Sequence, residues 1–458
     1  MEKHLTIMMI VFNELKWVKL SVESIRAMGD VDDIDLIIVD NCSTDGLRDW
    51  AVMQTDFTYV YMDEGMEAYG RIINRVRQEL NISGALLVME GHYAIVPGTL
   101  SHLMDALYRE NGIGAVGVVS NGLSRNQKLP SSCTSYEAAV RYAGNSERRK
   151  ERRVIGLAPD AVLLNTEVLD VLGNFDENIF GYMHSMRDQY LRMIVGGYKI
   201  MLCEDAVLWD LMDQDIYLDN TNQFWRIDED RKYLEYKWGM HYFQYLYNEN
   251  MISMIEESGD EEFNVLEVGC DCGATLFEIK NRYPNANIYG TDLNPGAVRI
   301  ASVFAETCIN NIEEKNLPWD EHFFDIIIFG DVLEHLRDPK STLEYCKRYL
   351  RDGGRIIASI PNVMHVSVME QLLKGYFTYT EEGLLDKTHI HLFTGKEIFK
   401  MFRSCGFEIE RMESIFISVT EEQSKLIDHL LTLGRGTERF MYETFQYVVK
   451  AKAGAENV

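Results

Sequence analysis

Two long stretches of the chain alternate short, wholly apolar runs with segments that place apolar residues at helical spacing. In the first stretch, the apolar runs cover 6–12, 36–39 and 85–89, and the helical segments cover 15–28, 67–80 and 99–110. Runs of about four to eight apolar residues are typical of strands that are buried on both faces. Strands of this kind that alternate with helices predict a mostly parallel sheet with helices on both sides.

The second stretch shows a similar pattern, with mainly apolar runs of strand length at 264–268, 287–290, 324–328 and 355–359. Between the two stretches, the segment 212–260 is rich in acids and in aromatic residues at helical spacing, and the segment 421–447 is amphipathic. We therefore expect two α/β domains and two helical parts. Their expected boundaries are an α/β domain at 1–215, a helical connector at 216–262, a second α/β domain at 263–418 and a helical tail at 419–458.

The 458-residue chain carries a formal net charge of −27. A charge of this size repels phosphate backbones and anionic lipid surfaces, so we expect no nucleic-acid partner and no unassisted membrane docking. No apolar run reaches the roughly 20 residues of a membrane helix, and no signal peptide precedes the first strand. The eight cysteines are scattered, and the one close pair, Cys270 and Cys272, lacks a zinc spacing. These features indicate a reduced, cytoplasmic protein.

A glycine-rich turn joins the first strand of the second stretch to a helix. It reads Glu267-Val-Gly269-Cys270-Asp-Cys-Gly273. Glycines allow the backbone to pass close to a ligand, and the start of a helix presents N–H groups that no helical carbonyl accepts. The next strand ends at Asp292, where a carboxylate can accept hydrogen bonds from both hydroxyls of a ribose. The turn by itself is also compatible with a dinucleotide-binding enzyme that transfers hydride.

Three further motifs follow the turn in order. They are Phe324-Asp325 at the start of a strand, then Leu333-Glu334-His335-Leu336, then Gly353-Gly354. Together with the turn and Asp292, they resemble class I S-adenosylmethionine-dependent methyltransferases. A hydride-transferring enzyme would explain the turn but neither of the last two motifs. The resemblance implies a Rossmann-like α/β fold with S-adenosylmethionine as the cofactor.

The same resemblance implies which residues contact the cofactor. The glycines shape the loop around its methionine part with Glu267 beside it, and Asp292 holds the ribose. Asn311-Ile312 lies where the family usually has an acid and an apolar residue beside adenine; asparagine keeps an acceptor there but loses the charge. The expected contacts are Glu267, Gly269, Cys270, Gly273, Asp292, Leu293, Asn311 and Ile312.

Methyl transfer to oxygen or nitrogen needs a group that removes a proton. The imidazoles nearest to the motifs, and therefore the candidate catalytic residues of this half, are His335, His389 and His391. Alternatively, oxygen ligands with one imidazole suit magnesium or zinc, and the residues for such a site would be Asp331, Glu334, His335 and Asn362. The stretch 360–394 looks like a methyltransferase subgroup that accompanies bacterial surface-glycan enzymes, which implies a sugar or a glycan precursor as the acceptor.

The first stretch has motifs of its own at strand ends. They are Phe12-Asn13-Glu14, Val39-Asp40-Asn41-Cys-Ser-Thr-Asp-Gly46, Tyr69-Gly70-Arg71, Val96-Pro97-Gly98, Gly173-Asn-Phe-Asp-Glu177 and Leu191-Arg192. In this order they resemble family-2 glycosyltransferases with the GT-A fold. The resemblance implies a sugar nucleotide whose base is read by strand-end carboxylates and amides. The expected contacts are Phe12, Asn13, Asp40, Asn41 and Arg71.

Sugar transfer also needs Mg²⁺ or Mn²⁺ beside the diphosphate and a base for the acceptor hydroxyl. The chain departs from the family at both positions, with Glu90-Gly91-His92 where the acidic cluster is expected and Met186 where the base is expected. An active transferase would therefore have to use Glu90, His92 and Asp210 for the metal and Asp188 or His184 as the base. A domain that keeps the fold but only binds its ligand is the alternative.

Three functions remain open at this point. The leading hypothesis is a bifunctional bacterial enzyme that transfers a sugar and methylates a surface polysaccharide or a glycoprotein glycan. In the second, the methyltransferase half acts while the first domain only binds a sugar nucleotide or a glycan. In the third, the chain is a non-catalytic scaffold of a glycan assembly complex, and the intact turn with Asp292 argues against it. The pattern does not define an oligomeric state.

Overall fold

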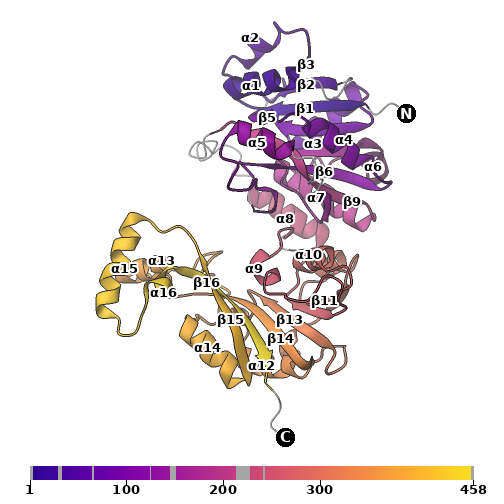
Figure 1. Cartoon of the computed structure of the whole chain (residues 1–458). Helices are drawn as coiled ribbons and strands as arrows, with labels where there is room; N and C mark the ends of the chain where they lie inside the picture. Colours follow the sequence, from indigo (N-terminus) through magenta and orange to yellow (C-terminus); the bar gives the residue numbers. More distant parts are fainter. Residues whose placement is uncertain are drawn as a thin grey trace. The chain divides into compact units, whose positions relative to one another are not determined.

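The computed structural model describes the chain in seven segments, which are residues 4–28, 34–63, 67–123, 125–144, 151–212, 227–240 and 243–454. The chain divides into two compact units, Met1–Leu246 and Tyr247–Val458, and each has its own sheet and its own core (Figure 1). Both units are mixed α/β structures, as predicted from the alternation of apolar runs and helical segments.

The sheet of the first unit has nine strands in the described residues, in the order β3-β2-β1-β4-β8-β6-β9-β5, with β7 paired to β9. The strands are β1 (Leu5–Val11), β2 (Ile34–Asp40), β3 (Thr58–Tyr61), β4 (Ala85–Glu90), β5 (Tyr93–Ile95), β6 (Ile113–Ser120), β7 (Glu151–Val154), β8 (Ala161–Asn165) and β9 (Lys199–Asp210). Strands β3, β2, β1 and β4 are parallel, whereas β8 runs antiparallel to both of its neighbours. The prediction of a mostly parallel sheet therefore holds for the first four strands. It misses the antiparallel β8, because an antiparallel strand buried on both faces has the same apolar pattern as a parallel one.

The helices of the first unit are α1 (Leu15–Arg26), α2 (Leu47–Ala51), α3 (Tyr69–Glu79), α4 (Thr99–Leu107), α5 (Tyr136–Ala143), α6 (Thr166–Leu172), α7 (Tyr182–Val195) and α8 (Ile227–Trp238). Most of α1 shows the pattern of a surface helix, with Val18, Val22 and Ile25 buried on one side. Helix α7 differs, because nearly its whole circumference is buried, including the polar side chains of His184 and Asp188. Helix α8 covers the side of α7 that would otherwise face solvent.

The sheet of the second unit has the strand order β12-β11-β10-β13-β14-β16-β15. Its strands are β10 (Asn264–Val268), β11 (Asn287–Asp292), β12 (Glu306–Ile309), β13 (Phe324–Gly330), β14 (Leu350–Pro361), β15 (Phe407–Phe416) and β16 (Thr444–Ala453). The first five strands in this order are parallel, and β16 runs antiparallel between β14 and β15. The carboxyl ends of β10, β11, β12 and β13 therefore lie along one edge of the sheet, where ligands bind in open α/β folds.

The helices of the second unit are α9 (Glu249–Ile252), α10 (Ala274–Arg282), α11 (Pro295–Ala301), α12 (Pro339–Lys347), α13 (Val366–Leu373), α14 (Gly395–Ser404), α15 (Glu421–Leu433) and α16 (Arg439–Glu443). Two 3-10 turns, at Ile312–Glu314 and Leu333–His335, follow β12 and β13. Helices α13, α15 and α16 lie together beside the sheet (Figure 1) and share a small cluster formed by Val366, Ile427 and Tyr442.

The prediction of a helical tail at 419–458 is wrong for its last part. Residues 421–433 and 439–443 are helical, but Thr444–Ala453 forms β16 in the interior of the second sheet. Side chains of β16 alternate between two core clusters, with Tyr447, Val449 and Ala451 in one and Val448 in the other. This alternation has the period of a strand. The prediction extended the helical pattern of 421–443 into this strand, which directly follows α16.

The predicted connector at 216–262 is divided between the two units. Helix α8 belongs to the first unit and α9 to the second, and residues 213–226 and 241–242 lie outside the described residues. The second unit thus begins before the predicted boundary at residue 263 and extends past the predicted one at 418.

In the described part of the chain, no helix combines the length and the apolar character that a membrane crossing requires.

Candidate functional site

The glycine-rich turn of the second unit lies between β10 and α10. Gly269 has φ +72°, and a Cβ at this position would lie 2.6 Å from Cγ2 of Val332. The N–H groups of Gly269 and Cys270 donate to the carbonyl of Thr291 at the end of β11, over 2.8 and 3.1 Å. Gly273 begins α10 with φ +78°, and a Cβ there would lie 2.9 Å from the ring of Phe304. Glycine is therefore required at both predicted positions, and the turn is tied to the neighbouring strand.

Glu267 lies at the end of β10, directly before this turn. Glu267 is 4% exposed, and its Oε2 is buried without a hydrogen-bond partner in the described structure. Burial raises the pKa of Glu267 to about 8, and the nearby charges of Asp271 and Asp292 add to this effect. A buried carboxylate oxygen without a partner is costly, so its presence beside the turn indicates a ligand that supplies a donor or a positive charge.

Asp292 lies at the end of β11, on the same edge of the sheet. Its Oδ2 accepts the N–H of Asp271 over 2.9 Å, and its Oδ1 accepts the N–H of Asn294 over 2.8 Å. These bonds fix the orientation of the carboxylate, and each oxygen keeps a second lone pair for a ligand hydroxyl. Burial raises the pKa of Asp271 to about 6, and φ +45° places this residue in the left-handed region. The turn is thus held in a strained conformation around the predicted cofactor position.

The adenine side of the predicted site differs from the expectation. Ile312 is buried in the core of the second unit, and the Oδ1 of Asn311 accepts the N–H of Glu313. By contrast, Leu293 is 67% exposed and Ile309 is 59% exposed. Ile309 pairs in register with Asp292, so the two exposed side chains lie at adjacent strand ends.

Asn310, the next residue along the chain, was also missed by the sequence reasoning. Its Oδ1 is buried without a partner, while its Nδ2 donates to Asn316. Ile309 and Asn310 thus offer the apolar contact and the acceptor that the sequence assigned to Ile312 and Asn311. Ile309 is the last residue of β12 and Asn310 follows it, so both are further candidates for this role, while Asn311 and Ile312 stay a prediction.

The three candidate histidines of the second unit lie near the turn Leu333–His335. The backbone carbonyl of Glu334 accepts the N–H groups of Ile390 and His391, each over 2.9 Å, which brings the segment 388–391 against this turn. The rings of His335 and His389 are 4.9 Å apart and nearly perpendicular. His391 contacts the carbonyl of Arg337 through Nε2, over 3.2 Å. The structure thus brings two of the three imidazoles together and turns the third towards the backbone.

The hydrogen bonds of the first two rings define their tautomers. Nδ1 of His389 lies 3.2 Å from the carbonyl of Leu384, and Nδ1 of His335 lies 3.1 Å from the carbonyl of Thr388. A carbonyl only accepts, so in both rings Nδ1 carries the proton and Nε2 keeps its lone pair. Burial lowers the pKa of His389, and the nearby ring of His335 lowers it further. His389 is therefore neutral near pH 7 and able to accept a proton at Nε2.

Glu334 is fully buried beside these rings, and both of its carboxylate oxygens lack a partner in the described structure. Burial raises its pKa well above the ordinary value, and the charge of Asp331 adds to the shift. Glu334, His335 and His389 bring three possible metal-ligand atoms within 4.8 Å of one another. In the described part of the chain, they are the group of His, Cys, Asp or Glu side chains that does so. Asn362, a predicted ligand, has partners elsewhere: its Nδ2 donates to the carbonyls of Met441 and Thr444, and its Oδ1 accepts the N–H of Met364.

The residues of the second unit fit S-adenosylmethionine. The partnerless Oε2 of Glu267 suits the positively charged methionine end of the cofactor, and the oriented carboxylate of Asp292 suits the ribose. The backbone at Gly269 and Gly273 leaves space that any side chain would fill. The exposed Leu293 and Ile309 suit the faces of adenine.

In the first unit, the expected nucleotide contacts mainly hold two loops together. Asp40 is fully buried and accepts the N–H of Ser43 over 2.7 Å and the hydroxyl of Tyr59 over 2.6 Å. Asn41 binds the backbone of Glu67 through both ends of its amide. Asn13, with φ +55°, accepts the N–H of Thr44 over 2.7 Å. These bonds shape the loops after β1 and β2 into a rigid edge.

The other two expected contacts stand at the surface of this edge. Phe12 is half-buried, and Arg71 is exposed and lies 3.5 Å from Glu177. Arg71 begins the exposed side of α3, while its neighbour Gly70 packs against Phe175, where a Cβ would lie 2.8 Å away. The structure thus leaves Phe12, Asn13 and Arg71 accessible and gives Asp40 and Asn41 internal partners.

The predicted metal ligands of the first unit do not form a metal site. His92 is 1% exposed, and its Nδ1 lies 3.6 Å from an oxygen of Glu90 and 3.6 Å from an oxygen of Glu14. Burial opposes a charge on this ring, but the nearby carboxylates of Glu14 and Glu90 outweigh it and raise the pKa of His92 to about 9. Asp210 accepts the N–H of Met212 over 2.9 Å. Among the described residues, Glu90, His92 and Asp210 do not bring three ligand atoms within 4.8 Å of one another, so they do not converge on one point as the ligands of Mg²⁺ or Mn²⁺ must.

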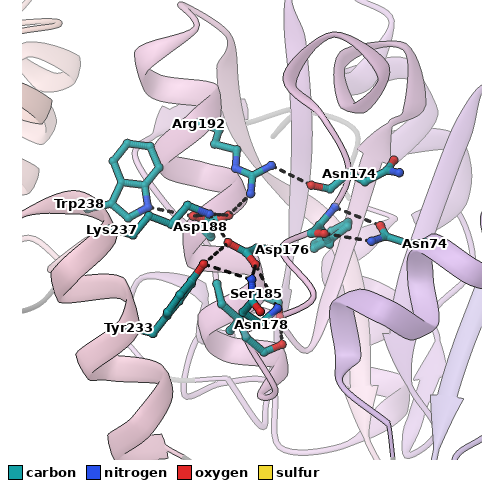
Figure 2. Close-up of polar contacts among 12 residues, drawn as sticks. Asn74, Asn174, Asp176, Asn178, Ser185, Asp188, Arg192, Tyr233, Lys237 and Trp238 are labelled. Atoms are coloured by element: carbon teal, nitrogen blue, oxygen red, sulfur yellow. Dashed lines mark hydrogen bonds and ion pairs between the residues drawn. The ribbon is translucent and has the colours of Figure 1, made fainter.

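Asp188 of α7 lies in a buried polar network (Figure 2). Its carboxylate, which is fully buried, binds the guanidinium of Arg192 over 2.5 Å and the ammonium of Lys237 over 2.9 Å, and it accepts the indole N–H of Trp238 over 2.8 Å. Lys237 also binds Asp176 over 2.6 Å. This arrangement speaks against Asp188 as the base for a sugar acceptor, because its oxygens hold α8 in place.

The alternative base, His184, is also enclosed. It is 4% exposed, and burial together with the charges of Arg187 and Arg231 lowers its pKa to about 4. Met186, at the position where the family has its base, is fully buried. Lys237 and Trp238 were missed as partners of this region, because they come from α8, beyond the part of the chain that carries the glycosyltransferase motifs.

Comparisons with known proteins agree with this division. Residues 6–172 match the family model described as glycosyl transferase family 2, and residues 215–411 match the family model described as a methyltransferase domain. The two domains predicted from the sequence are thus confirmed. The chain combines a family-2 glycosyltransferase domain with a class I methyltransferase domain.

Individual relatives resemble the second unit. The malonyl-[acyl-carrier protein] O-methyltransferase of Hahella chejuensis is 24% identical over 194 residues, which are 41% of this chain and 64% of that protein. A tRNA N(3)-cytidine methyltransferase of Mus musculus is 23% identical over 214 residues, which are 42% of this chain and 51% of that protein. This chain thus spans less than two thirds of either relative. A solved S-adenosylmethionine-dependent methyltransferase of Methanosarcina mazei is 18% identical, with 46% of this chain and 100% of that chain covered and a TM-score of 0.34.

Proposed function

We propose that the second unit transfers a methyl group from S-adenosylmethionine to a sugar hydroxyl of a bacterial surface polysaccharide or glycoprotein glycan. The observation that carries this proposal is the partnerless, buried oxygen of Glu267 beside a turn in which only glycine fits. When bound, S-adenosylmethionine supplies an electrophilic methyl group. A cytoplasmic location, where this cofactor and sugar nucleotides are made, accompanies the proposal.

His389 is our candidate for the proton acceptor of this reaction. Its Nδ1–H donates to the carbonyl of Leu384, which leaves the lone pair of Nε2 for the acceptor hydroxyl. The lowered pKa keeps the ring neutral near pH 7, as a base requires. His335 stands beside it and holds the same tautomer. His391 donates to a backbone carbonyl through Nε2 instead, so its free nitrogen is Nδ1, and it lies outside the pair formed by His335 and His389.

A divalent cation offers a second route to the same proton transfer. Glu334, His335 and His389 would hold it, and a bound Mg²⁺ or Mn²⁺ would lower the pKa of an acceptor hydroxyl. The buried, partnerless oxygens of Glu334 are the observation that favours this route. Activity that survives a chelator would support the imidazole alone, and activity that is lost and then restored by Mg²⁺ or Mn²⁺ would support the cation.

The choice of a sugar as acceptor rests on the fused glycosyltransferase domain. The relative from Hahella chejuensis carries an O-methyltransferase name, which supports an oxygen acceptor. The relative from Mus musculus acts on a tRNA cytidine by its name. A net charge of −27 disfavours a polyanionic acceptor for this chain, and a sugar lacks the repulsion that a phosphate backbone would meet.

For the first unit we favour binding of a sugar nucleotide or a glycan without transfer. Three features support this choice over the bifunctional hypothesis. The position of the base is Met186, Asp188 is engaged by α8, and the acids beside His92 lack the geometry of a metal site. The accessible edge formed by Phe12, Asn13 and Arg71 remains available to a nucleotide.

Calorimetry with S-adenosylmethionine tests the core of the proposal. We expect binding by the intact chain, and we expect Asp292→Ala to weaken it by about tenfold or more, since one lost hydrogen-bonded contact of a charged group costs at least about 1.5 kcal/mol. Asp320→Ala, at an exposed acid of the same unit, is the matched control and should bind normally. Absence of binding to the intact chain would overturn the proposal.

The acceptor is tested with methyl-labelled S-adenosylmethionine. The intact chain is incubated with bacterial surface glycans, with nucleotide-activated sugars and with tRNA, and labelled products are separated. We expect label in a carbohydrate fraction and none in tRNA. Label in tRNA alone would contradict the sugar acceptor while leaving the methyltransferase assignment intact.

A further inference from the structure

Four carboxylates surround His92 at the carboxyl end of β4. Glu90 ends β4, Glu14 precedes α1, and Asp210 ends β9, while Asp160 accepts the N–H of Glu90 through its backbone carbonyl over 3.0 Å. Burial raises the pKa of Glu90 to about 8, and the charges of the other three acids of the cluster contribute to this shift. The four carboxylates are therefore close enough to repel one another. A positive charge, from a side chain or from a bound ion, would relieve this repulsion.

The ring of His92 lies among these acids. Its side chain is 2% exposed, and Nδ1 is 3.6 Å from Oε1 of Glu14 and 3.6 Å from Oε2 of Glu90. In the described part of the chain, Glu14, Glu90 and His92 do not bring three ligand atoms within 4.8 Å of one another, as Glu334, His335 and His389 do. The two carboxylates thus approach the ring from different sides, and the ring fills the space between them.

Gly91 is the residue that permits this arrangement. A Cβ at Gly91 would lie 2.6 Å from Cγ1 of Val11 and 2.8 Å from Oε2 of Glu14. The backbone between Glu90 and His92 therefore lies directly against the end of β1, which places Glu14 beside the imidazole. This close approach is built from two separate elements, so the position of His92 does not depend on a flexible loop alone.

A divalent cation has strict requirements that this cluster fails to meet. Mg²⁺ takes oxygen ligands at about 2.0–2.1 Å in near-octahedral geometry, so its carboxylates must converge on a single point. Here the carboxylate oxygens of Glu14 and Glu90 converge on a ring nitrogen. An ion could enter only if the buried ring of His92 left its place.

We propose that the first unit works without a divalent cation, because His92 occupies the place among the acids that the cation would take. This inference deepens the proposed binding role of the first unit, on which it rests for the identity of the ligand. It also supports the proposed lack of transfer, since a departing nucleoside diphosphate would lack the cation that neutralises its charge.

Binding of Mn²⁺, followed by electron paramagnetic resonance, tests the inference directly. All proteins carry Glu334→Gln, which removes a ligand from the separate group in the second unit. We expect no Mn²⁺ bound by this parent. His92→Asp, which restores an acid on each side of Gly91, should gain a site for one Mn²⁺. His102→Asp is the matched control, because His102 also lies beside an acid, 3.9 Å from Asp205, and this variant should gain nothing.

The parent protein keeps the inference testable if His92→Asp fails to fold, as judged by circular dichroism. Mn²⁺ binding by the parent that disappears on Glu90→Gln would overturn the inference. A second measurement is the affinity for uridine diphosphate with a chelator and with Mn²⁺. We expect the two affinities to agree within about twofold, and a tightening by Mn²⁺ of about tenfold or more would overturn the inference.

The two proposals fail in different ways. If uridine diphosphate binds under neither condition, the nucleotide ligand of the proposed function is wrong. The Mn²⁺ measurements on the parent and on His92→Asp would still decide whether His92 has replaced the cation.

Discussion

Hydrogen-bond accounting separates two kinds of buried carboxylate in this chain. Asp188 is fully buried, and its oxygens are engaged by Arg192, Lys237 and Trp238. Glu267 is equally enclosed, yet its Oε2 has no partner. A carboxylate whose oxygens all have partners holds elements together, whereas one with a buried oxygen that lacks a partner can bind a ligand. The sequence alone gives both residues the same chemical description, and only their partners distinguish them.

The raised pKa of Glu267 gives the cofactor site a pH dependence. Without a ligand its pKa is about 8, so the carboxyl is protonated at neutral pH. The positive charges of S-adenosylmethionine favour the ionised form, so binding releases a proton. We therefore expect the affinity to rise as the pH approaches about 8 and to level off above it. Calorimetry across this range, in buffers of different ionisation enthalpy, measures both the affinity and the released proton.

Glu267→Gln is the control for this pH dependence. The variant keeps the shape of the side chain but cannot ionise, so its affinity should be lower and should vary less with pH. Equal pH dependence in the variant and the parent would show that another group titrates, and it would contradict the role given to Glu267.

Asp188→Asn tests the structural role of the buried network. Removing one charge leaves Arg192 and Lys237 without their shared partner, and breaking a buried ion pair typically costs about 3–5 kcal/mol. Because these two cations are 19% and 25% exposed, we expect a loss near the lower end, about 3 kcal/mol. Urea unfolding of the first unit measures it.

The comparison variant for this experiment is Asp170→Asn. Asp170 also pairs with an arginine, Arg77, but its side chain is 66% exposed. A surface pair of this kind contributes less than about 1 kcal/mol. If both variants lost the same small amount of stability, the ion pairs of Asp188 would contribute no more than a surface pair does. Asp188 would then again be a candidate base.

At the scale of elements, the chain shows which parts of a fold a sequence pattern can predict. The parallel strands β1, β2, β10 and β11 were found because they are mainly apolar runs of strand length, and two of them, β2 and β11, end in Asp40 and Asp292. The ends of parallel strands meet at one edge of a sheet, so the sequence could also predict which strand-end residues lie near one another. Whatever depended on pairing between distant segments was missed.

Two examples show this limit in physical terms. Asp188 was predicted as a base, because no local pattern says that α8 would supply Lys237 and Trp238 from 49 and 50 residues further along the chain. On the adenine side of the cofactor site, the sequence does not tell that Ile312 enters the core while Ile309, the last residue of β12, stays exposed. Tertiary packing decides both cases.

Strand β16 carries a prediction of its own. It pairs with β14 along Arg355–Pro361 and with β15 along most of its length, so it joins β15 to the rest of the sheet. A chain that stops after Glu443 should lose the sheet order beyond β14 and should fail to bind S-adenosylmethionine. A chain that stops after Gly454 is the control and should bind normally. Normal cofactor binding by the shorter chain would mean that β16 is dispensable, contrary to its buried position.

On the scale of the whole molecule, the two units are independent in their cores. The described core clusters contain residues of one unit only, as the clusters around Leu87 and around Ile327 illustrate. A high negative charge favours solubility but adds repulsion within each unit. Stability should therefore be a property of each unit and should respond to each unit's own ligand.

Thermal unfolding followed by calorimetry should resolve this independence as two transitions. S-adenosylmethionine binds only the folded second unit, so at about 100 times its dissociation constant it should stabilise that unit by about 2.7 kcal/mol and leave the other transition in place. Asp188→Asn should lower only the transition of the first unit, because the partners of Asp188 all lie in that unit. Asp292→Ala should reduce the stabilisation by the cofactor, to about 1.4 kcal/mol for a tenfold loss of affinity and further for a larger loss. If a single transition moved as one in all of these experiments, the units would fold cooperatively, and the assignment of separate ligands to separate cores would have to be abandoned.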